Sequence, residues 1–325
     1  SGAIGETVYF RIYRVLDPTG TKIESTTPLK IYNLAIAPAL PSILRVGGTQ
    51  LIQWVKTGAF SSPSADLKVF VSTDGTTFPP ANEITSTPLP TGSSFNWANI
   101  PASFRSNTVK VRVEWQGSTN VQADSTQIAI KPNLNLTAPD GGGPYGAGTG
   151  LAVNFTHTGN STDNWKIWYS TDGTTYPAGN DIATVNGTTV TPLNGNAFSC
   201  SSMVSPVACT WTIPSSSAVL TGTARIKVEL VGDAANVTDA SLSTFAVKGA
   251  LSTITPNSTQ YWKVGELKNI TWVSSPLDQG NVRIVYSLDG TTYPEVTPDQ
   301  KVTPVDVNSQ TGTPYPWTVP SAAIG

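Results

Sequence analysis

Residue types that could do covalent or acid–base chemistry are scarce in this 325-residue chain, which holds two cysteines, Cys200 and Cys209, and one histidine, His157. Eight residues lie between the cysteines. This is not the C-x-x-C spacing of a redox pair, and it favours a local disulfide that closes a loop in an oxidising compartment. No nucleophile elbow or Ser-His-Asp grouping accompanies His157, so we expect a surface or strand-edge histidine. The sequence therefore predicts no enzymatic activity and no cofactor.

Three aspartates recur in register, at Asp74, Asp172 and Asp289, each within a Ser-x-Asp-Gly-Thr-Thr motif. One chemistry for them is calcium binding. Calcium takes roughly six to eight oxygen ligands, usually from several carboxylates, whereas the flanking residues offer only hydroxyls. We expect β-turn residues instead, because Asp is favoured in turns, and we predict no metal site. The same interpretation applies to three scattered loop acids, Asp163, Asp233 and Asp239.

Composition narrows the class of protein. The chain has 19 Lys and Arg against 21 Asp and Glu, so it offers no basic surface for nucleic acid. It contains no run of roughly 18 apolar residues that could span a membrane. Its nine Trp, ten Tyr and nine Phe require burial, which predicts a folded chain. Charged residues make up only 12% of the chain, which with many threonines favours an extracellular or cell-surface location.

The aspartate motifs mark an internal repeat. They begin at Ser72, Ser170 and Ser287, so the spacings are 98 (170−72) and 117 (287−170) residues. A run of alternating apolar and polar residues precedes each motif, which predicts a half-buried strand. The following Asp-Gly predicts a tight hairpin turn, because Gly accepts positive φ at low cost. The three runs are 67–71, 165–169 and 282–286.

Other landmarks keep the same order in each repeat. A Trp or Phe strand is expected before each motif and a Trp strand ending at Pro after it, and two more strands close each complete repeat. About seven short strands in roughly 100 residues indicate an antiparallel β-sandwich, with the aromatics in its core. The expected strands are 51–54, 152–155 and 269–272 before the motif, 95–97, 211–213 and 317–319 after it, then 109–114 and 224–229, and finally 127–130 and 244–247.

The third repeat carries a resemblance to a known family. It contains Tyr-Trp-Lys-Val-Gly at 261–265, Ile-Thr-Trp at 270–272 and Trp-Thr-Val-Pro at 317–320 around its motif. This order resembles the Ig-like/fibronectin-like modules of large bacterial surface proteins, which are similar in pattern to the Ser/Thr-rich wall-protein domain of fungi. The resemblance covers nearly the whole chain, and the second repeat departs most, at 141–145. It implies an extracellular, stalk-like or adhesive role and no activity.

The predicted fold class is all-β, namely tandem antiparallel Ig-like β-sandwiches with incomplete modules at both ends. Module one spans 34–131, and module two spans 132–249 with the cysteine loop. Module three spans 250–325 and lacks its last strands. Residues 1–33 match the C-terminal strands of a sandwich: 7–14, a turn at 17–20, and 28–32 correspond to 109–131 and 224–248.

We predict that residues 1–33 complete the last sandwich of a neighbouring copy, because a truncated sandwich exposes strand edges and half a core. Separate chains would then exchange strands head to tail, or the chain is one period of a longer repeat polypeptide. The alternatives are closure of the chain on itself and a boundary that merely cut two domains. The expected assembly residues are Thr7, Val8, Tyr9, Phe10, Arg11, Ile12, Tyr13, Leu29, Ile31, Trp317 and Val319.

The predicted function is an extracellular filament, sheath or stalk whose partners are further copies of the chain. The alternative is an adhesin or a carbohydrate-binding accessory module, with glycans as partners. Trp165 and Trp168 lie three apart on one strand and so on opposite faces. With Trp115 and Tyr145 they are candidates for a sugar platform, although packing between modules is the more ordinary role of such rings. The candidate glycosylation sites are the sequons at Asn135, Asn160, Asn186, Asn236 and Asn257; those at Asn154 and Asn269 fall in expected strands.

Overall fold

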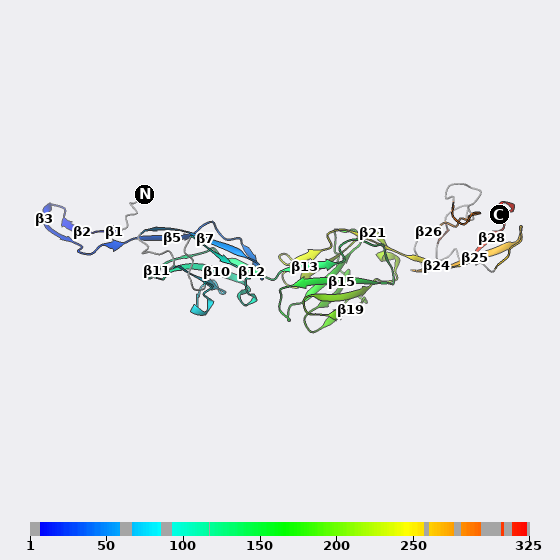
Figure 1. The fold of residues 1–325 in the computed structure, drawn as a ribbon, viewed down its shortest axis with the longest axis horizontal. Coiled ribbons are helices and arrows are strands. Elements are labelled where there is room, and N and C mark those ends of the chain that lie inside the picture. Colours follow the sequence, from blue (N-terminus) through cyan, green and yellow to red (C-terminus); the bar gives the residue numbers. More distant parts are fainter. Residues whose placement is uncertain are drawn as a thin grey trace. The chain divides into compact units, whose positions relative to one another are not determined.

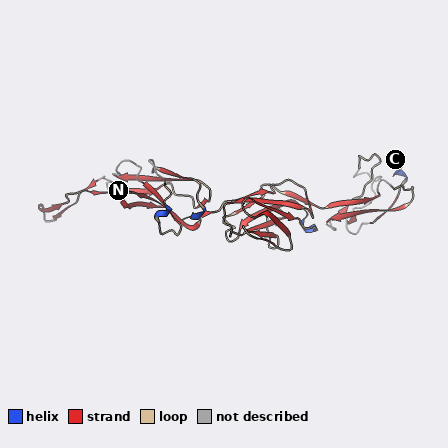
Figure 2. Cartoon of the chain, turned by 60° about the horizontal axis from the view of Figure 1, so that its bottom comes forward, coloured by secondary structure: helices blue, strands red, loops and turns tan. Residues whose placement is uncertain are grey.

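A computed structural model describes residues 7–58, 67–85, 93–116, 118–256, 260–275, 281–293, 307–308 and 314–323. The chain divides into two compact units, Ser1–Asn133 and Leu134–Gly325. Regular structure in the described residues is almost entirely β-strand, with a few short 3-10 helices (Figure 2). Within those residues, no helix has the length and apolar character needed to cross a membrane. The all-β class predicted from the repeat pattern is confirmed.

The N-terminal hairpin (residues 7–31) holds four strands that pair with one another. The outer pair joins β1 to β4 and the inner pair joins β2 to β3, both antiparallel. Figure 1 labels β1, β2 and β3 in this segment, drawn in blue. Among the described strands, these four have no other partner. Only Ile31 separates β4 from β5, the first strand of module one. The bounds are β1 Thr7–Val8, β2 Arg11–Arg14, β3 Asp17–Glu24 and β4 Leu29–Lys30.

The turn of this hairpin differs from the expected 17–20. The chain reverses at Val15 and Leu16, and Arg14 lies opposite Asp17. Turn-forming residue types favoured the later position. The register that begins with Arg11 opposite Glu24 and reaches Tyr13 opposite Lys22 would place the turn near the expected position. It shifts before Arg14, which pairs with Asp17, and this shift leaves the two apolar residues at the tip.

Module one is a sandwich of two sheets. One sheet has the order β5-β7-β9, and the other has the order β11-β10-β12-β6 with β8 also paired to β10. Its elements are β5 Tyr32–Ile36, β6 Ile43–Arg45, β7 Gln50–Gly58, β8 Leu67–Ser72, η2 Pro80–Asn82, β9 Ser94–Trp97, η3 Ala102–Phe104, β10 Ser106–Trp115, β11 Ser118–Asp124 and β12 Ile128–Lys131.

Module two has the same two-sheet plan, with more described strands in each sheet than module one. Its sheets have the orders β13-β15-β20-β19 and β14-β23-β21-β16-β17-β18, with β22 also paired to β21. Its elements are β13 Leu134–Ala138, β14 Tyr145–Gly146, β15 Gly150–His157, β16 Trp165–Ser170, β17 Asp181–Val185, β18 Val190–Pro192, β19 Ala197–Ser202, β20 Val207–Thr212, η4 Ser217–Val219, β21 Thr221–Leu230, β22 Thr238–Ala240 and β23 Phe245–Lys248.

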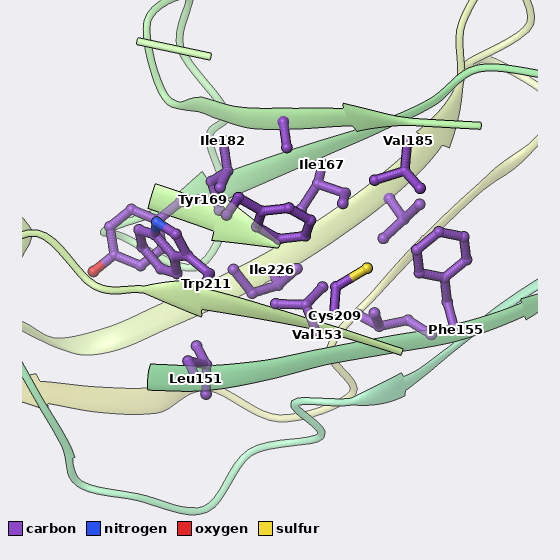
Figure 3. Packing of buried hydrophobic residues seen from close by; sticks show 14 of the residues in the cluster. Leu151, Val153, Phe155, Ile167, Tyr169, Ile182, Val185, Cys209, Trp211 and Ile226 are labelled. Atoms are coloured by element: carbon purple, nitrogen blue, oxygen red, sulfur yellow. The ribbon is translucent and has the colours of Figure 1, made fainter. Parts of the chain in front are cut away.

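The core of module two lies between its sheets, where alternate residues of each strand point inward. Figure 3 shows Tyr169 beside Trp211, with Ile167, Ile226 and Val153 next to them toward the centre of the view. The ring centroids of Tyr169 and Trp211 are 4.9 Å apart. These side chains are almost completely buried. The core of module one is built in the same way around Trp54 and Trp97. The expected core role of the aromatics is therefore observed in both modules.

Module three is less fully packed in its described part. It has a sheet of order β24-β25-β28 and a separate β26-β27 pair. Its buried hydrophobic cluster comprises Ile270 and Trp272, with half-buried neighbours that include Tyr286 and Trp317. Its elements are β24 Ala250–Thr255, β25 Leu267–Ser275, β26 Asn281–Val282, β27 Val307–Asn308, β28 Tyr315–Thr318 and η6 Ser321–Ala323.

The repeated Asp-Gly motif forms a turn in every module but not a two-residue hairpin. In module two, ten residues (171–180) separate β16 from β17, so the expected tight hairpin is wrong there. The reason is local. The Asp172 carboxylate accepts hydrogen bonds from Ser170, Thr174 and Thr175, and these bonds fold residues 170–175 into a compact turn of their own. Gly173 follows with φ +77°, a value that glycine adopts without strain.

Candidate functional site

The N-terminal hairpin reproduces the bonding of the closing strands of the complete modules. The amide of Phe10 donates to Ser25 Oγ at 3.0 Å, and the amide of Ser25 donates to the carbonyl of Phe10 at 2.8 Å. Val111 and Ser125 make the same two bonds at 3.0 and 2.8 Å, and Ile226 makes them with Ser241 at 3.2 and 2.9 Å. Phe10, Val111 and Ile226 are therefore equivalent positions.

Two further contacts support this equivalence. Arg11 pairs with Glu24 at 2.7 Å, as Arg112 pairs with Asp124 at 2.7 Å. The strand pairing also matches at the other end of the hairpin: Val8 lies opposite Leu29, Val109 opposite Ile128, and Ala224 opposite Phe245. Residues 8–31 are thus a third copy of the strand set β10–β12.

Burial separates the hairpin from its counterparts. Phe10 and Ile12 are 58% and 73% exposed, whereas Val111 and Val113 are fully buried in module one. Leu29 is 51% exposed, and the equivalent Ile128 is buried. Contiguous exposed apolar side chains mark an interaction surface. We call the face of the hairpin that carries Phe10, Ile12 and Leu29 its inward face. Its residue types are those of a sandwich core, but in the described chain these three side chains are exposed.

The other predicted assembly residues divide by position. Val8 and Ile31 are half-buried on the inward face, while Tyr9 and Tyr13 are exposed on the outward face. Thr7 lies opposite Lys30. Trp317 and Val319 instead belong to module three itself. The Trp317 ring lies 6.0 Å from that of Trp262 and 5.6 Å from that of Tyr286, and Val319 is buried.

Module three carries an open apolar groove of about 290 Å³ lined by Leu251, Ile254, Trp272 and Ile284, among others. Ile284 lies three residues before the motif serine, as Val69 and Ile167 do. In the complete modules this position is fully buried. Val69 lies opposite Val113 on β10, and Ile167 lies opposite Val228 on β21. Ile284, which lines the groove, therefore stands at the position that faces β10 and β21 in modules one and two.

A second edge of module three has the same character. In the complete modules, a short strand pairs in parallel with the closing strand: Leu44 lies opposite Ile130, and Tyr145 opposite Val247. Trp262 is the equivalent residue in module three. Like Leu44 and Tyr145, it stands two residues before an apolar–Gly pair. The glycine amide of each pair donates to a backbone carbonyl just after the Trp strand, at Ile100, Ile213 or Val319. Residues 261–263 form no strand, and Tyr261 is 96% exposed.

The cysteines and the motif aspartates have structural roles in the described chain. Cys200 and Cys209 form a disulfide between the paired strands β19 and β20. The Asp172 carboxylate is engaged in its turn, and the Thr175 hydroxyl and amide hold the pKa of Asp172 well below its usual range. Asp74 and Asp289 make the equivalent bonds. The described residues include no cluster of three acidic, His or Cys side chains able to hold a metal ion.

His157 lies at the end of β15 against the ring of Trp165, with centroids 4.6 Å apart. Its Nδ1 accepts a hydrogen bond from the Gly159 amide at 3.1 Å, so the neutral ring carries its proton on Nε2. Partial burial lowers the pKa of His157, and the nearby Asp163 carboxylate opposes that shift. These contacts give the residue a packing role.

The candidate sugar-binding aromatics are packed rather than presented together. Trp165 is buried, Trp115 packs on Tyr32 with centroids 4.8 Å apart, and Tyr145 packs on Phe245 at 5.3 Å. Trp168 is half-buried on the outer face, where Lys166 Nζ lies 4.2 Å from its ring centroid. Of the sequons, Asn135 and Asn160 are exposed, Asn186 and Asn236 are half-buried, and Asn257 lies outside the described residues.

Comparison with known proteins gives fold-level similarity. No protein-family model and no curated protein matches the chain. Among solved structures it is similar to the fibronectin(III)-like modules of CbhA from Clostridium thermocellum, at 13% identity over 67% of this chain and 93% of that one, with a TM-score of 0.20.

It is also similar to the N-terminal eight Ig domains of Down Syndrome Cell Adhesion Molecule, at 11% identity over 94% of this chain and 36% of that one, with a TM-score of 0.29. A third similar structure holds three N-terminal domains of the bacteriophage RB49 Highly Immunogenic Outer Capsid protein, at 12% identity over 75% of this chain and 69% of that one, with a TM-score of 0.22. The strand orders and registers above are those of tandem Ig-like/fibronectin-like sandwiches.

Proposed function

We propose that the chain is a structural protein of the cell exterior that assembles head to tail, with the N-terminal hairpin of one copy closing the sandwich of module three in the next. The observation that carries the proposal is the match between the exposed inward face of the hairpin and the open groove of module three. Such assembly is heterologous and therefore extends into a filament, sheath or stalk.

The complete modules supply the geometry of the joint. By their registers, Ile12 would lie opposite Ile284 in an antiparallel pair, and Ile31 would lie opposite Trp262 in a parallel pair. The hairpin thus adds one strand to each of two strand edges of module three and covers the apolar groove between them. Burial of a Phe, Ile or Leu side chain contributes about 1.5–3 kcal/mol, so Phe10, Ile12 and Leu29 together supply substantial binding energy.

A matched pair of substitutions on neighbouring residues tests the joint. Ile12→Glu places a charge at a position whose counterparts, Val113 and Val228, are fully buried. Tyr13→Glu introduces the residue type that the counterparts Glu114 and Glu229 already carry. The purified full chain and both variants are compared by sedimentation velocity and negative-stain microscopy.

We expect filaments from the parent chain and from Tyr13→Glu, and monomers from Ile12→Glu. Monodisperse 34 kDa particles from the parent chain at all concentrations would overturn the proposal. The denatured mass of material from the natural source separates its two versions, because subunits that exchange strands run near 34 kDa whereas one period of a continuous repeat polypeptide belongs to a far larger chain.

A further inference from the structure

A cation over an aromatic ring recurs on the outer face of both complete modules. The guanidinium carbon of Arg112 lies 3.8 Å from the ring centroid of Phe78, and Lys227 Nζ lies 4.6 Å from that of Tyr176. Both rings stand six residues after the motif serine, at the end of the Asp-Gly-Thr-Thr segment. Both cations stand one residue after the equivalent positions Val111 and Ile226.

Outside modules one and two, the ring and the cation of this arrangement belong to different parts of the chain: the ring to module three and the cation to the N-terminal hairpin. The ring of module three is Tyr293, six residues after Ser287; it is 55% exposed and borders the groove. The cation at the equivalent strand position is Arg11, one residue after Phe10. Arg11 already holds its carboxylate partner, Glu24, as Arg112 holds Asp124 while stacking on Phe78.

We infer that Arg11 of one copy stacks on Tyr293 of the copy that accepts its hairpin, and that this contact determines the register of the joint. The inference rests on the proposed strand completion and adds to it the residues that select one alignment. The partner it implies is a second copy of this chain, joined through the outer face as well as the apolar groove.

Apolar alternation alone leaves the register ambiguous. A slip of one residue would turn Phe10 and Ile12 away from the groove, so the hydrophobic pattern excludes it. A slip of two residues keeps apolar side chains inward, and the pattern does not exclude it. Such a slip moves Arg11 by about 6.5–7 Å along the strand and brings Tyr9 or Tyr13 to its place. Neither tyrosine offers the cation that both complete modules place over this ring.

Cysteine cross-linking reads the register directly. The full chain with Ile12→Cys and Ile284→Cys reports the aligned joint, and the chain with Phe10→Cys and Ile284→Cys reports a slip of two. Each pair is combined with Arg11→Gln, with Tyr293→Leu and with both substitutions, and the inter-chain disulfide yields are compared after mild oxidation. Glu24→Gln is the control that removes the ion pair and keeps the cation.

We expect each single substitution to lower the ratio of aligned to slipped cross-link by about two- to fivefold, the range of an exposed cation–π contact. The double substitution should lower it no further, and Glu24→Gln should leave the ratio dependent on Tyr293. If the aligned cross-links form with a yield that does not depend on residues 11 and 293, this inference is overturned while the proposed strand completion is supported. Absence of inter-chain cross-links at both pairs would overturn both.

Discussion

The amide of Phe10 bonds the hydroxyl of Ser25 at 3.0 Å, and the Ser25 amide returns a bond to the Phe10 carbonyl at 2.8 Å. The same exchange occurs at the buried pair of Val111 and Ser125. The N-terminal hairpin therefore has the local geometry of a closing strand set while its apolar side chains remain exposed. A preformed strand set loses less conformational entropy when it binds, so the hairpin is suited to act as a donor.

Substitution of Ser25 tests the importance of this preformed geometry. Ser25→Ala removes the hydroxyl acceptor of the Phe10 amide, and a bond of this kind contributes about 0.5–1.5 kcal/mol. We expect an increase of about two- to tenfold in the concentration at which the full chain assembles, measured by sedimentation. Thr26→Ala removes the next hydroxyl along the chain and is the matched control. Equal effects of the two substitutions would contradict the prediction.

Loss of the disulfide should weaken module two. Cys200 and Cys209 are nine positions apart, and closing so short a loop stabilises a fold by about 2–3 kcal/mol on the loop-entropy account. The double variant Cys200→Ser/Cys209→Ser of the full chain should show one unfolding transition shifted to lower temperature by calorimetry. Assembly should persist, because the disulfide lies outside the proposed joint. A shift in every transition would contradict a local role.

Acid should destabilise module two through His157. Burial lowers the pKa of this imidazole, so its neutral form belongs to the folded state. The stabilisation is complete above the ordinary pKa of about 6.5 and is lost as the pH falls through the lowered value. We expect a lower unfolding midpoint at pH 5 than at pH 7.5, and a smaller difference in His157→Gln. The same pH difference in both chains would show that other groups cause it.

The motif aspartates should add a second loss of stability at lower pH. Hydrogen bonds from Thr175 lower the pKa of Asp172, and Asp74 is held in the same way by Thr77. Their stabilisation is present above the ordinary carboxyl pKa of about 3.9 and declines as the pH falls below it. Asp172→Ala should lower the thermal midpoint of module two at pH 7 and reduce the further fall of this midpoint in acid. Asp233→Ala, at another loop acid, provides a comparison. The same fall of the midpoint in acid for Asp172→Ala and the parent chain would count against the prediction.

Much of the fold could be predicted from the repeat. The runs that precede the motif, such as 165–169, carry an apolar residue at every second position, and the strands β8 and β16 form at the expected positions. The third run, expected over 282–286, forms a strand only at Asn281–Val282. Asp172 is a turn residue, as predicted from the lack of a second carboxylate in its motif. Its turn is longer than predicted: the Asp172 carboxylate accepts hydrogen bonds from the amides of Thr174 and Thr175, and the loop runs on to residue 180 before β17 begins.

The contacts that decide the proposed site could not be predicted in the same way. Phe78 and Arg112 are distant in sequence. The register of β8 with β10 brings their segments together, and the structure places the Arg112 guanidinium over the Phe78 ring. The tip of the hairpin differs from its predicted position for a related reason. Turn propensity at 17–20 is a local signal, whereas the chain reverses at Val15 and Leu16 because the strand register shifts between Tyr13 and Arg14.

The single residue between β4 and β5 has a mechanical consequence for the proposed joint. Strand Leu29–Lys30 continues through Ile31 into Tyr32–Ile36, the first strand of the donor's own module one. Tension on a filament would therefore enter the joint along the axis of the inserted strand. Its bonds to residues 261–263 would be sheared together instead of being peeled apart in succession, so a joint without covalent linkage would resist pulling better than its equilibrium affinity suggests.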